Sequence, residues 1–306
     1  MLKRYILAAV AVLSLAGPAV AQSIPSGLDL LVATPVATAD GNRHVIIMYD
    51  RDSGKGGIGR ADQYDWSRDL TQITPFFAKG KKYVMFYSRN RGEAVVHEIH
   101  RNGLGLGPRT HHHKGFRKTW DEIVSFGAGC VLFYSRQSGA AEIYRANRKS
   151  GGVGKRVYSS GWRKSWTHIV ELGYKTVPYL LFYDRSRGEG QIHSMRGNCT
   201  FQKETYKSTR WRRSWTLISR AVGSKSSNEV LVFYDAGKGE GEIYGVKRGK
   251  LEKRRQSRTG WRKTWDDIIW RQQNNGSSNL LFYDRKTGAT NIYQLERNGA
   301  VGRRLK

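Results

Sequence analysis

The hydrophobic residues of this chain recur in short apolar runs that each end on a tyrosine. A glycine lies five residues after every one of these tyrosines, and a β-branched residue lies nine residues after it. Six copies at the same offsets indicate an internal repeat, which is the sequence signature of a repeat architecture. The six tyrosines are Tyr49, Tyr87, Tyr134, Tyr183, Tyr234 and Tyr283.

Each repeat predicts four short strands, which the third copy places at Trp120–Val124, Cys130–Tyr134, Ala141–Tyr144 and Lys155–Tyr158. Continuous apolar runs such as Leu180–Tyr183 are typical of strands covered on both faces, and blades packed face to face provide that cover. We therefore predict an all-β fold, a six-bladed β-propeller of four-stranded antiparallel blades. Because the first unit is short, a five-bladed ring is the alternative.

A second motif, aromatic-Arg-Lys-x-Trp-x-x-Ile, lies between successive tyrosines. Its apolar positions at i, i+4 and i+7 have helical spacing, which makes a helical solenoid the competing fold. The 35 glycines and the β-branched and aromatic runs favour strands. We therefore expect Trp166–Val170 to form a strand entered from a turn, and assign the second tryptophan to the core. The second tryptophans are Trp120, Trp166, Trp215 and Trp265.

The N-terminus has the pattern of a signal peptide. Lys3 and Arg4 precede an apolar stretch, and Ala19-Val20-Ala21 has the small residues of a cleavage site. The sequence predicts a signal peptide at 1–21 and a single propeller domain of six repeats at 22–306. No later run is long enough to span a membrane. We expect a secreted or periplasmic protein after cleavage near Ala21.

The net charge of +28 is spread along the chain, and removal of Lys3 and Arg4 with the signal would leave +26. A surface with this field favours anionic partners. We expect glycans or other anionic polymers of the cell envelope or matrix, and the same charge would bind nucleic acid without sequence specificity. The oligomeric state is left open.

At the Trp-x-x-Ile, Leu-Phe-Tyr/Phe-Asp, Gly and Ile-Tyr positions the chain resembles two families of propeller lectins, the tachylectin-2-type lectins and the fucose-binding propeller lectins of insect-pathogenic bacteria. The resemblance covers about residues 28 to 306. It implies a propeller with one shallow sugar site per blade or blade junction. The Arg-Lys pairs and the large charge depart from a neutral-sugar lectin, which favours acidic or phosphorylated glycans.

The turn at the head of each Trp motif is the first candidate ligand surface. An aromatic face can stack on a sugar ring, and an adjacent guanidinium can bind carboxylate, sulfate or phosphate. A tryptophan packed between blades beside a solvated Arg-Lys turn is the structural alternative. The candidate residues are Trp66, Phe116, Arg117, Trp162, Arg163, Lys164, Trp211, Arg212, Arg213, Trp261, Arg262 and Lys263.

The Asp-Arg pair after a repeat tyrosine is the second candidate. Asp184-Arg185 and Asp284-Arg285 could form one wall of a sugar pocket between blades. Since turns favour aspartate at such positions, a turn-capping role is the preferred interpretation.

Metal, cofactor and catalytic chemistry have little support in the sequence. His111-His112-His113 lacks nearby ligands at metal spacing, so it predicts an exposed loop and no metal site. No cofactor motif occurs. Cys130 and Cys199 fall at different places in the repeat, so a disulfide is not favoured. The same residues repeated six times suit binding better than catalysis, although a single-copy site built from residues such as Glu122, His168 or Asp267 stays open.

We therefore predict a secreted lectin-like propeller that is not an enzyme and binds acidic or phosphorylated glycans through repeated Trp/Arg/Lys sites. Two alternatives remain. One is a non-specific binder of polyanions, including extracellular DNA, and the other is a protein-interaction scaffold without a glycan site.

Overall fold

The computed structural model describes residues 30–38, 41–50, 55–58, 62–65, 70–78, 80–99, 106–147, 150–173, 177–225, 227–272 and 276–305, with side chains from residue 70 onward. The predicted signal peptide at 1–21 and Trp66 lie outside these residues. All regular elements described are β-strands. In the part of the chain that is described, no helix is long and apolar enough to cross a membrane.

The strands form six four-stranded antiparallel sheets, which we call blades 1 to 6. Blades 1 to 3 comprise β1 (Leu30–Thr38), β2 (Gly41–Asp50), β3 (Lys55–Ile58), β4 (Asp62–Asp65), β5 (Leu70–Ala78), β6 (Lys81–Ser88), β7 (Glu93–Ile99), β8 (Leu106–Lys114), β9 (Glu122–Phe126), β10 (Cys130–Tyr134), β11 (Ala140–Ala146) and β12 (Val153–Gly161). Blades 4 to 6 comprise β13 (His168–Leu172), β14 (Tyr179–Asp184), β15 (Glu189–Met195), β16 (Phe201–Ser208), β17 (Leu217–Val222), β18 (Glu229–Asp235), β19 (Glu240–Lys247), β20 (Lys250–Arg258), β21 (Asp267–Gln272), β22 (Ser278–Tyr283), β23 (Thr290–Leu295) and β24 (Val301–Arg304).

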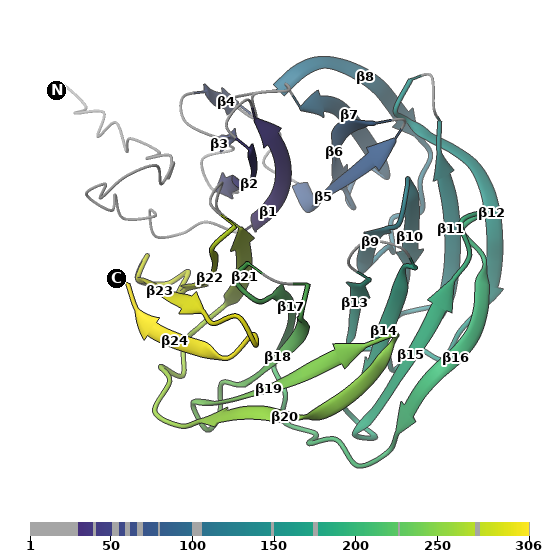
Figure 1. The fold of residues 1–306 in the computed structure, drawn as a ribbon. Helices are drawn as coiled ribbons and strands as arrows, with labels where there is room; N and C mark the ends of the chain where they lie inside the picture. Colours follow the sequence, from purple (N-terminus) through teal and green to yellow (C-terminus); the bar gives the residue numbers. More distant parts are fainter. Residues whose placement is uncertain are drawn as a thin grey trace, which may run out of the picture.

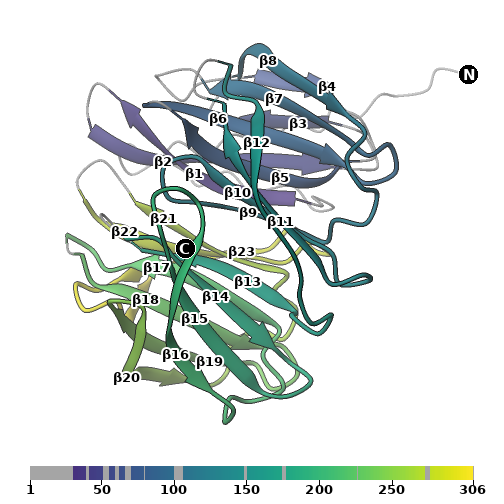
Figure 2. The same cartoon turned by 90° about the vertical axis from the view of Figure 1, so that its right-hand side faces the viewer.

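The sheets surround a common axis, with the first strand of each blade innermost (Figure 1). β5, β9, β13, β17 and β21 follow one another around this axis, and β1 lies beside both β5 and β21. Figure 2 views the ring from its edge, with the outer strands β12 and β16 toward the viewer. The predicted propeller of four-stranded antiparallel blades is confirmed. The six sheets match the six predicted units. The five-bladed alternative would apply only to blades 2 to 6, the blades whose side chains are described.

The core lies between adjacent blades. Every residue of β10 and β18 is buried, as the continuous apolar runs predict for strands covered on both faces. The outer strands β12, β16 and β20 have exposed positions along their length. Burial on both faces of the inner strands thus provides the apolar packing that holds successive blades together.

The repeat tyrosines tie each blade to the next one. The hydroxyl of Tyr134 donates to the carbonyl oxygen of Arg163 at 2.7 Å, and Tyr183 donates in the same way to Arg212 at 2.5 Å. Burial raises the pKa of Tyr134 and Tyr183 to about 12, so both hydroxyls keep their donor proton. The tyrosine recurs because each blade must anchor the Trp motif that follows it.

The repeat glycine is required by this same docking. Gly139 has a φ of 76°, and its carbonyl accepts a hydrogen bond from the Trp162 amide at 2.6 Å. A Cβ at residue 139 would lie 2.2 Å from the Trp162 carbonyl oxygen. Glycine supplies both the left-handed backbone and the space that the Trp motif occupies.

The second tryptophan of each Trp motif is buried, as predicted, but it does not lie in a strand. The predicted strands at Trp166–Val170 and Trp120–Val124 instead begin two residues later, at His168 and Glu122. The indole lies in a turn and fills the space between two blades, and the strand begins two residues after the tryptophan. This packing accounts for the spacing that also fits a helix, and the helical solenoid is wrong.

Cys130 and Cys199 form a disulfide, a pairing that the sequence did not favour. Cys130 begins β10 in blade 3, and Cys199 lies in the turn between β15 and β16 in blade 4. The two cysteines occupy different positions in the repeat, but they are neighbours because the start of β10 in blade 3 lies beside the β15–β16 turn of blade 4. The bond links residues 69 positions apart in the sequence.

Candidate functional site

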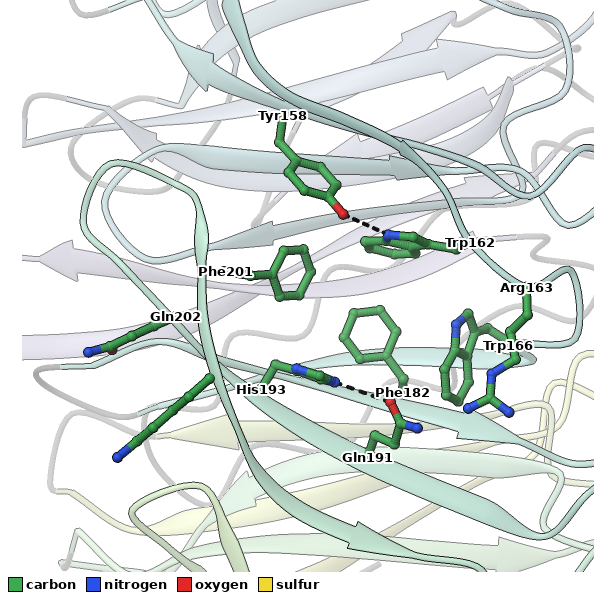
Figure 3. A pocket seen from close by; sticks show the side chains of 10 residues that line it. Tyr158, Trp162, Arg163, Trp166, Phe182, Gln191, His193, Phe201 and Gln202 are labelled. Atoms are coloured by element: carbon green, nitrogen blue, oxygen red, sulfur yellow. Dashed lines mark hydrogen bonds between the residues drawn. The ribbon is translucent and has the colours of Figure 1, made fainter.

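A pocket of about 500 Å³ opens between blades 3 and 4. Figure 3 shows aromatic side chains on several sides of it, contributed by β12, the β12–β13 connection, β14, β15 and β16. This volume is in the range of small-molecule sites. The pocket is lined by Tyr158, Trp162, Arg163, Trp166, Phe182, Gln191, His193, Phe201, Gln202 and Lys203.

The rings of Trp162 and His193 stand nearly perpendicular to the two phenylalanine rings of this pocket. The Trp162 ring centre lies 5.1 Å from Phe182 and 5.5 Å from Phe201, with interplanar angles of 87° and 76°. His193 stands at 90° to Phe201 and at 82° to Phe182. A hydrogen bond of 3.0 Å from Trp162 Nε1 to the Tyr158 hydroxyl fixes the indole. The result is an aromatic box with walls of defined orientation.

A chain of hydrogen bonds sets the protonation of His193. Arg163 binds the Glu189 carboxylate through two nitrogens at 2.7 Å each. Gln191 Nε2 donates to Glu189 at 2.6 Å, which turns its carbonyl oxygen toward His193 Nε2 at 3.2 Å. A carboxylate only accepts hydrogen bonds, so the Gln191 amide nitrogen faces Glu189 and the Gln191 carbonyl oxygen faces His193. That oxygen is also only an acceptor, so Nε2 of the neutral imidazole must carry the proton. His193 Nδ1 is then a hydrogen-bond acceptor.

The electrostatics of the network keep Glu189 charged and His193 neutral. The bonds from Arg163 lower the pKa of Glu189 to about 2. Burial lowers the pKa of His193, an effect opposed by Glu204 and reinforced by Lys207. At neutral pH the pocket therefore has an uncharged acceptor beside its aromatic walls.

Blade 4 departs from the repeat at the residues that form this pocket. Cross-strand register places His193 where blades 3, 5 and 6 have Tyr144, Tyr244 and Tyr293, and Gln191 where blades 3 and 5 have Glu142 and Glu242. In blades 3 and 5 the tyrosine hydroxyl donates to that glutamate at 2.6 Å. Blade 2 also has a histidine, His97, whose Nδ1 lies 3.1 Å from the Gly107 carbonyl. Among blades 2 to 6, only blade 4 has both a histidine at the position of His193 and a neutral amide side chain at the position of Gln191.

A second pocket, of about 400 Å³, lies at the equivalent junction of blades 4 and 5. Trp211 has the place of Trp162, and its Nε1 lies 3.4 Å from the Tyr206 hydroxyl. Glu242, Arg212 and Arg254 form ion pairs within the lining. The two pockets share a backbone frame, but the second has Glu242 and Leu251 where the first has Gln191 and Phe201.

The predicted motif arginines are bound by carboxylates of the blade that they enter. Their guanidinium groups also lie over the second tryptophans, with Arg163 Cζ 3.9 Å from the Trp166 ring centre. Each arginine therefore joins the motif turn to its blade. The ion-pair partners are Glu142 for Arg117, Glu189 for Arg163, Glu240 and Glu242 for Arg212, and Asp284 for Arg262.

The first aromatic residues of the motif are not equivalent in exposure. Phe116 and Trp261 are buried, with 6% and 7% of their surface exposed, whereas Trp162 and Trp211 are half-buried and line the two pockets. The neighbouring basic residues Lys164, Arg213 and Lys263 are exposed at the turns and line neither pocket.

The predicted Asp-Arg pairs stabilise the hairpin turns. Buried Asp184 accepts hydrogen bonds from the hydroxyls of Ser165 and Ser186 at 2.6 Å and from the Arg187 amide at 3.1 Å. Arg185 donates to the Arg213 carbonyl at 3.0 Å.

Asp284 and Arg285 occupy the same places in blade 6. Asp284 is buried and accepts from the Thr287 amide at 3.0 Å, while the Arg285 amide donates to Asp266 at 2.6 Å. These contacts fit the turn-capping interpretation of both pairs.

The other residues that break the repeat occupy equivalent positions in three blades. Glu122, His168 and Asp267 each lie opposite a repeat tyrosine at the start of an innermost strand, in blades 3, 4 and 6. Burial raises the pKa of Glu122 and of Asp267 to about 7. His168 Nε2 lies 2.9 Å from the Thr216 carbonyl. Among the described side chains, no group of three or more His, Cys, Asp or Glu could hold a metal ion. The run His111-His112-His113 lies in strand β8, so the predicted exposed loop there is wrong.

Sequence reasoning identified Trp162 and Arg163 but missed most of the pocket. Phe182, Gln191, His193 and Phe201 were assigned no part in ligand binding, and Trp166 was assigned to the core alone. The available signal was the departure of blade 4 from the repeat, eight and ten residues after Tyr183. In a repeat protein the exceptional residue of a unit is the better indicator of a site.

No protein-family model and no curated protein matches the chain. Solved structures match over most of its length. The periplasmic gluconolactonase of Pseudomonas aeruginosa has a TM-score of 0.52 and 11% identity over 87% of this chain and 77% of that one. A functionally unknown protein of Desulfotomaculum acetoxidans has a TM-score of 0.50 and 9% identity over 84% and 74%. A putative 6-phosphogluconolactonase of Bacteroides uniformis has a TM-score of 0.49 and 12% identity over 88% and 79%.

These comparisons and the side-chain contacts correct the predicted function. The neighbour with a TM-score of 0.52 is named a gluconolactonase and not a lectin. The predicted Trp/Arg/Lys turns are not equivalent, since their arginines form ion pairs with carboxylates and two of their four described first aromatic residues are buried. The prediction of a lectin-like glycan binder, with its polyanion and scaffold alternatives, is wrong. The gluconolactonase is an enzyme, whereas the sequence predicted no enzymatic activity, and at 11% identity the likeness shows the fold alone.

Proposed function

We propose that the protein binds a small planar heteroaromatic compound in the pocket between blades 3 and 4. The observation that carries the proposal is the aromatic box of Trp162, Phe182, Phe201 and His193, with an acceptor nitrogen in one wall. Aromatic rings pair best in stacked or edge-to-face arrangements, and walls at right angles offer both to a flat ligand.

The charges of the lining favour this ligand class over ions. The Glu189 carboxylate is bound by Arg163 and Gln191, so an organic cation would find no free counter-charge there. Arg163 is occupied by the same carboxylate, which removes it as an anion-binding group. Lys203 lines the pocket and has an exposed side chain. A neutral ring with an N–H donor for His193 Nδ1, and an acidic substituent directed toward Lys203, satisfies these groups.

Indole-3-acetate is the probe we would use to test the pocket, with 1-methylindole-3-acetate as its matched partner lacking the N–H. By isothermal titration calorimetry, we expect methylation to weaken binding about tenfold, because the His193 acceptor is left unpaired. Trp162→Leu should weaken binding of the parent compound about thirtyfold through loss of a stacking wall.

Trp211→Leu is the control variant, since it makes the same change at the equivalent position of blade 5 and should leave the affinity unchanged. Equal losses in both variants, or equal affinities of the two probes, would disprove the proposed site.

Binding should also depend on pH through His193. Only the neutral imidazole accepts a hydrogen bond at Nδ1, and burial holds the pKa of His193 below its usual 6.5. The affinity should therefore be constant between about pH 7 and 8 and fall about tenfold in all as the pH drops through that pKa, since protonation removes the same hydrogen bond. Titrations of the wild type and of His193→Phe at pH 7.5, 6 and 5 measure this. A profile that persists unchanged in the variant would assign the pH dependence to another group.

A further inference from the structure

Arg271 on the innermost strand of blade 6 is buried without an ion-pair partner among the described side chains. Only 4% of its surface is exposed, and neither Nε nor Nη1 has a hydrogen-bond partner. Burial lowers the pKa of Arg271 to about 10, so the guanidinium is still charged at neutral pH. A buried charge that lacks a counter-charge is strongly unfavourable.

The other blades place apolar residues at the position of Arg271. Pairing register aligns it with one residue in each of blades 2 to 5, and all four are buried. These residues are Phe76, Phe126, Leu172 and Ala221. The fold is thus built with an apolar side chain here, and blade 6 has replaced it with a cation.

Arg220 on β17 shows how this fold ordinarily accommodates a buried arginine. Its Nη1 lies 2.6 Å from Glu171 and its Nε lies 2.6 Å from Glu229. Two carboxylates supplied by the protein neutralise that guanidinium. Arg271 lacks the equivalent groups in the described part of the chain, so its counter-charge has to come from elsewhere.

The strand register places Arg271 at the closure of the ring. Side chains alternate between the two faces of a strand, so Arg271 shares a face with Ile269 and Asp267. Ile268, on the opposite face, packs in the cluster that blade 6 shares with blade 5. Arg271 therefore faces blade 1, and Asn279 lies directly across the strand pair with a buried carboxamide.

We propose that Arg271 and Asn279 form a binding site for one small oxyanion, a carboxylate or a phosphate, between blades 6 and 1. Arginine binds such groups through directed N–H bonds, and the amide of Asn279 adds a further donor. Since β21 is an innermost strand, the anion would approach from the axis of the ring. Because it would bridge the last blade and the first, its binding should stabilise the closed propeller.

The site is tested by thermal unfolding of the full chain with inorganic phosphate or acetate, at constant ionic strength maintained with sodium chloride. At a hundredfold excess over Kd, we expect the wild-type Tm to rise by about 4 °C. Arg271→Met should show no such rise, and it should be at least as stable as the wild type without the anion, because it places an apolar chain in an apolar position. Lys286→Met removes an exposed charge from the same blade and should respond like the wild type.

Two results would overturn this assignment. An equal rise in the wild type and in Arg271→Met would show that the anion acts on the general basic surface. A strongly destabilised Arg271→Met, together with a wild type that does not respond to either anion, would show that Arg271 is neutralised by an acidic residue of blade 1. A response to acetate alone or to phosphate alone would support the site and identify its anion.

Discussion

Removal of the Cys130–Cys199 disulfide should lower the free energy of unfolding by about 4 kcal/mol. The bond closes a loop of 69 residues, and in the chain-entropy model a loop of that length restricts the unfolded state by about this amount. Both cysteines are buried in the apolar cluster between blades 3 and 4. The double variant Cys130→Ala/Cys199→Ala leaves no cysteine in the chain, so denaturant unfolding monitored by tryptophan fluorescence measures the difference directly.

Reduction of the wild type provides the control for this prediction. A reducing agent should lower the stability of the wild type toward that of the double variant and leave the variant itself unchanged. A loss below about 1 kcal/mol, or an effect of the reducing agent on the variant, would contradict the role given to the bond. The first result would mean that interblade packing alone sets the stability.

The fold could be predicted because each repeated residue has a repeated structural task. The tyrosine, the glycine and the second tryptophan recur since every blade must dock on the next in the same way. Tyr134 and Gly139, for example, both contact the backbone of the following Trp motif. The disulfide could not be predicted by this logic, because it links a strand start to a turn in the neighbouring blade, and such a pairing is not part of the repeat.

The candidate site was harder to predict because recurrence was taken as a sign of ligand binding. Arg163 and Arg212 recur because they hold the Trp-motif turn to a carboxylate of their own blade. Neither His193 nor Gln191 predicts a binding site by its residue type alone. A site is indicated only when both are known to lie beside Phe182 and Phe201. The sequence contains the departure from the repeat, but only the cross-strand register shows that these residues line one space.

Glu189 joins the stability of blade 4 to the shape of the pocket, and Glu189→Gln should therefore affect both. Glu189 is buried, and its carboxylate binds Arg163 and Gln191 together. Its pKa of about 2 lies below the ordinary 4.5, so the charged form stabilises the fold. With allowance for solvent screening near the surface, we expect a loss of about 2 kcal/mol at pH 7.

The pH dependence of this loss separates the charge from the shape of the side chain. A carboxyl with a lowered pKa contributes its full stability above about pH 4.5, and that contribution disappears as the pH falls toward 2. Urea unfolding should thus show a constant difference between the wild type and Glu189→Gln from pH 5 to 8, and a shrinking one at pH 4 and 3. Glu204→Gln, on the exposed surface of β16, is the control and should change stability little. If the difference at pH 3 equals that at pH 7, the carboxylate charge is not what binds Arg163, and the histidine orientation argued for the pocket loses its anchor.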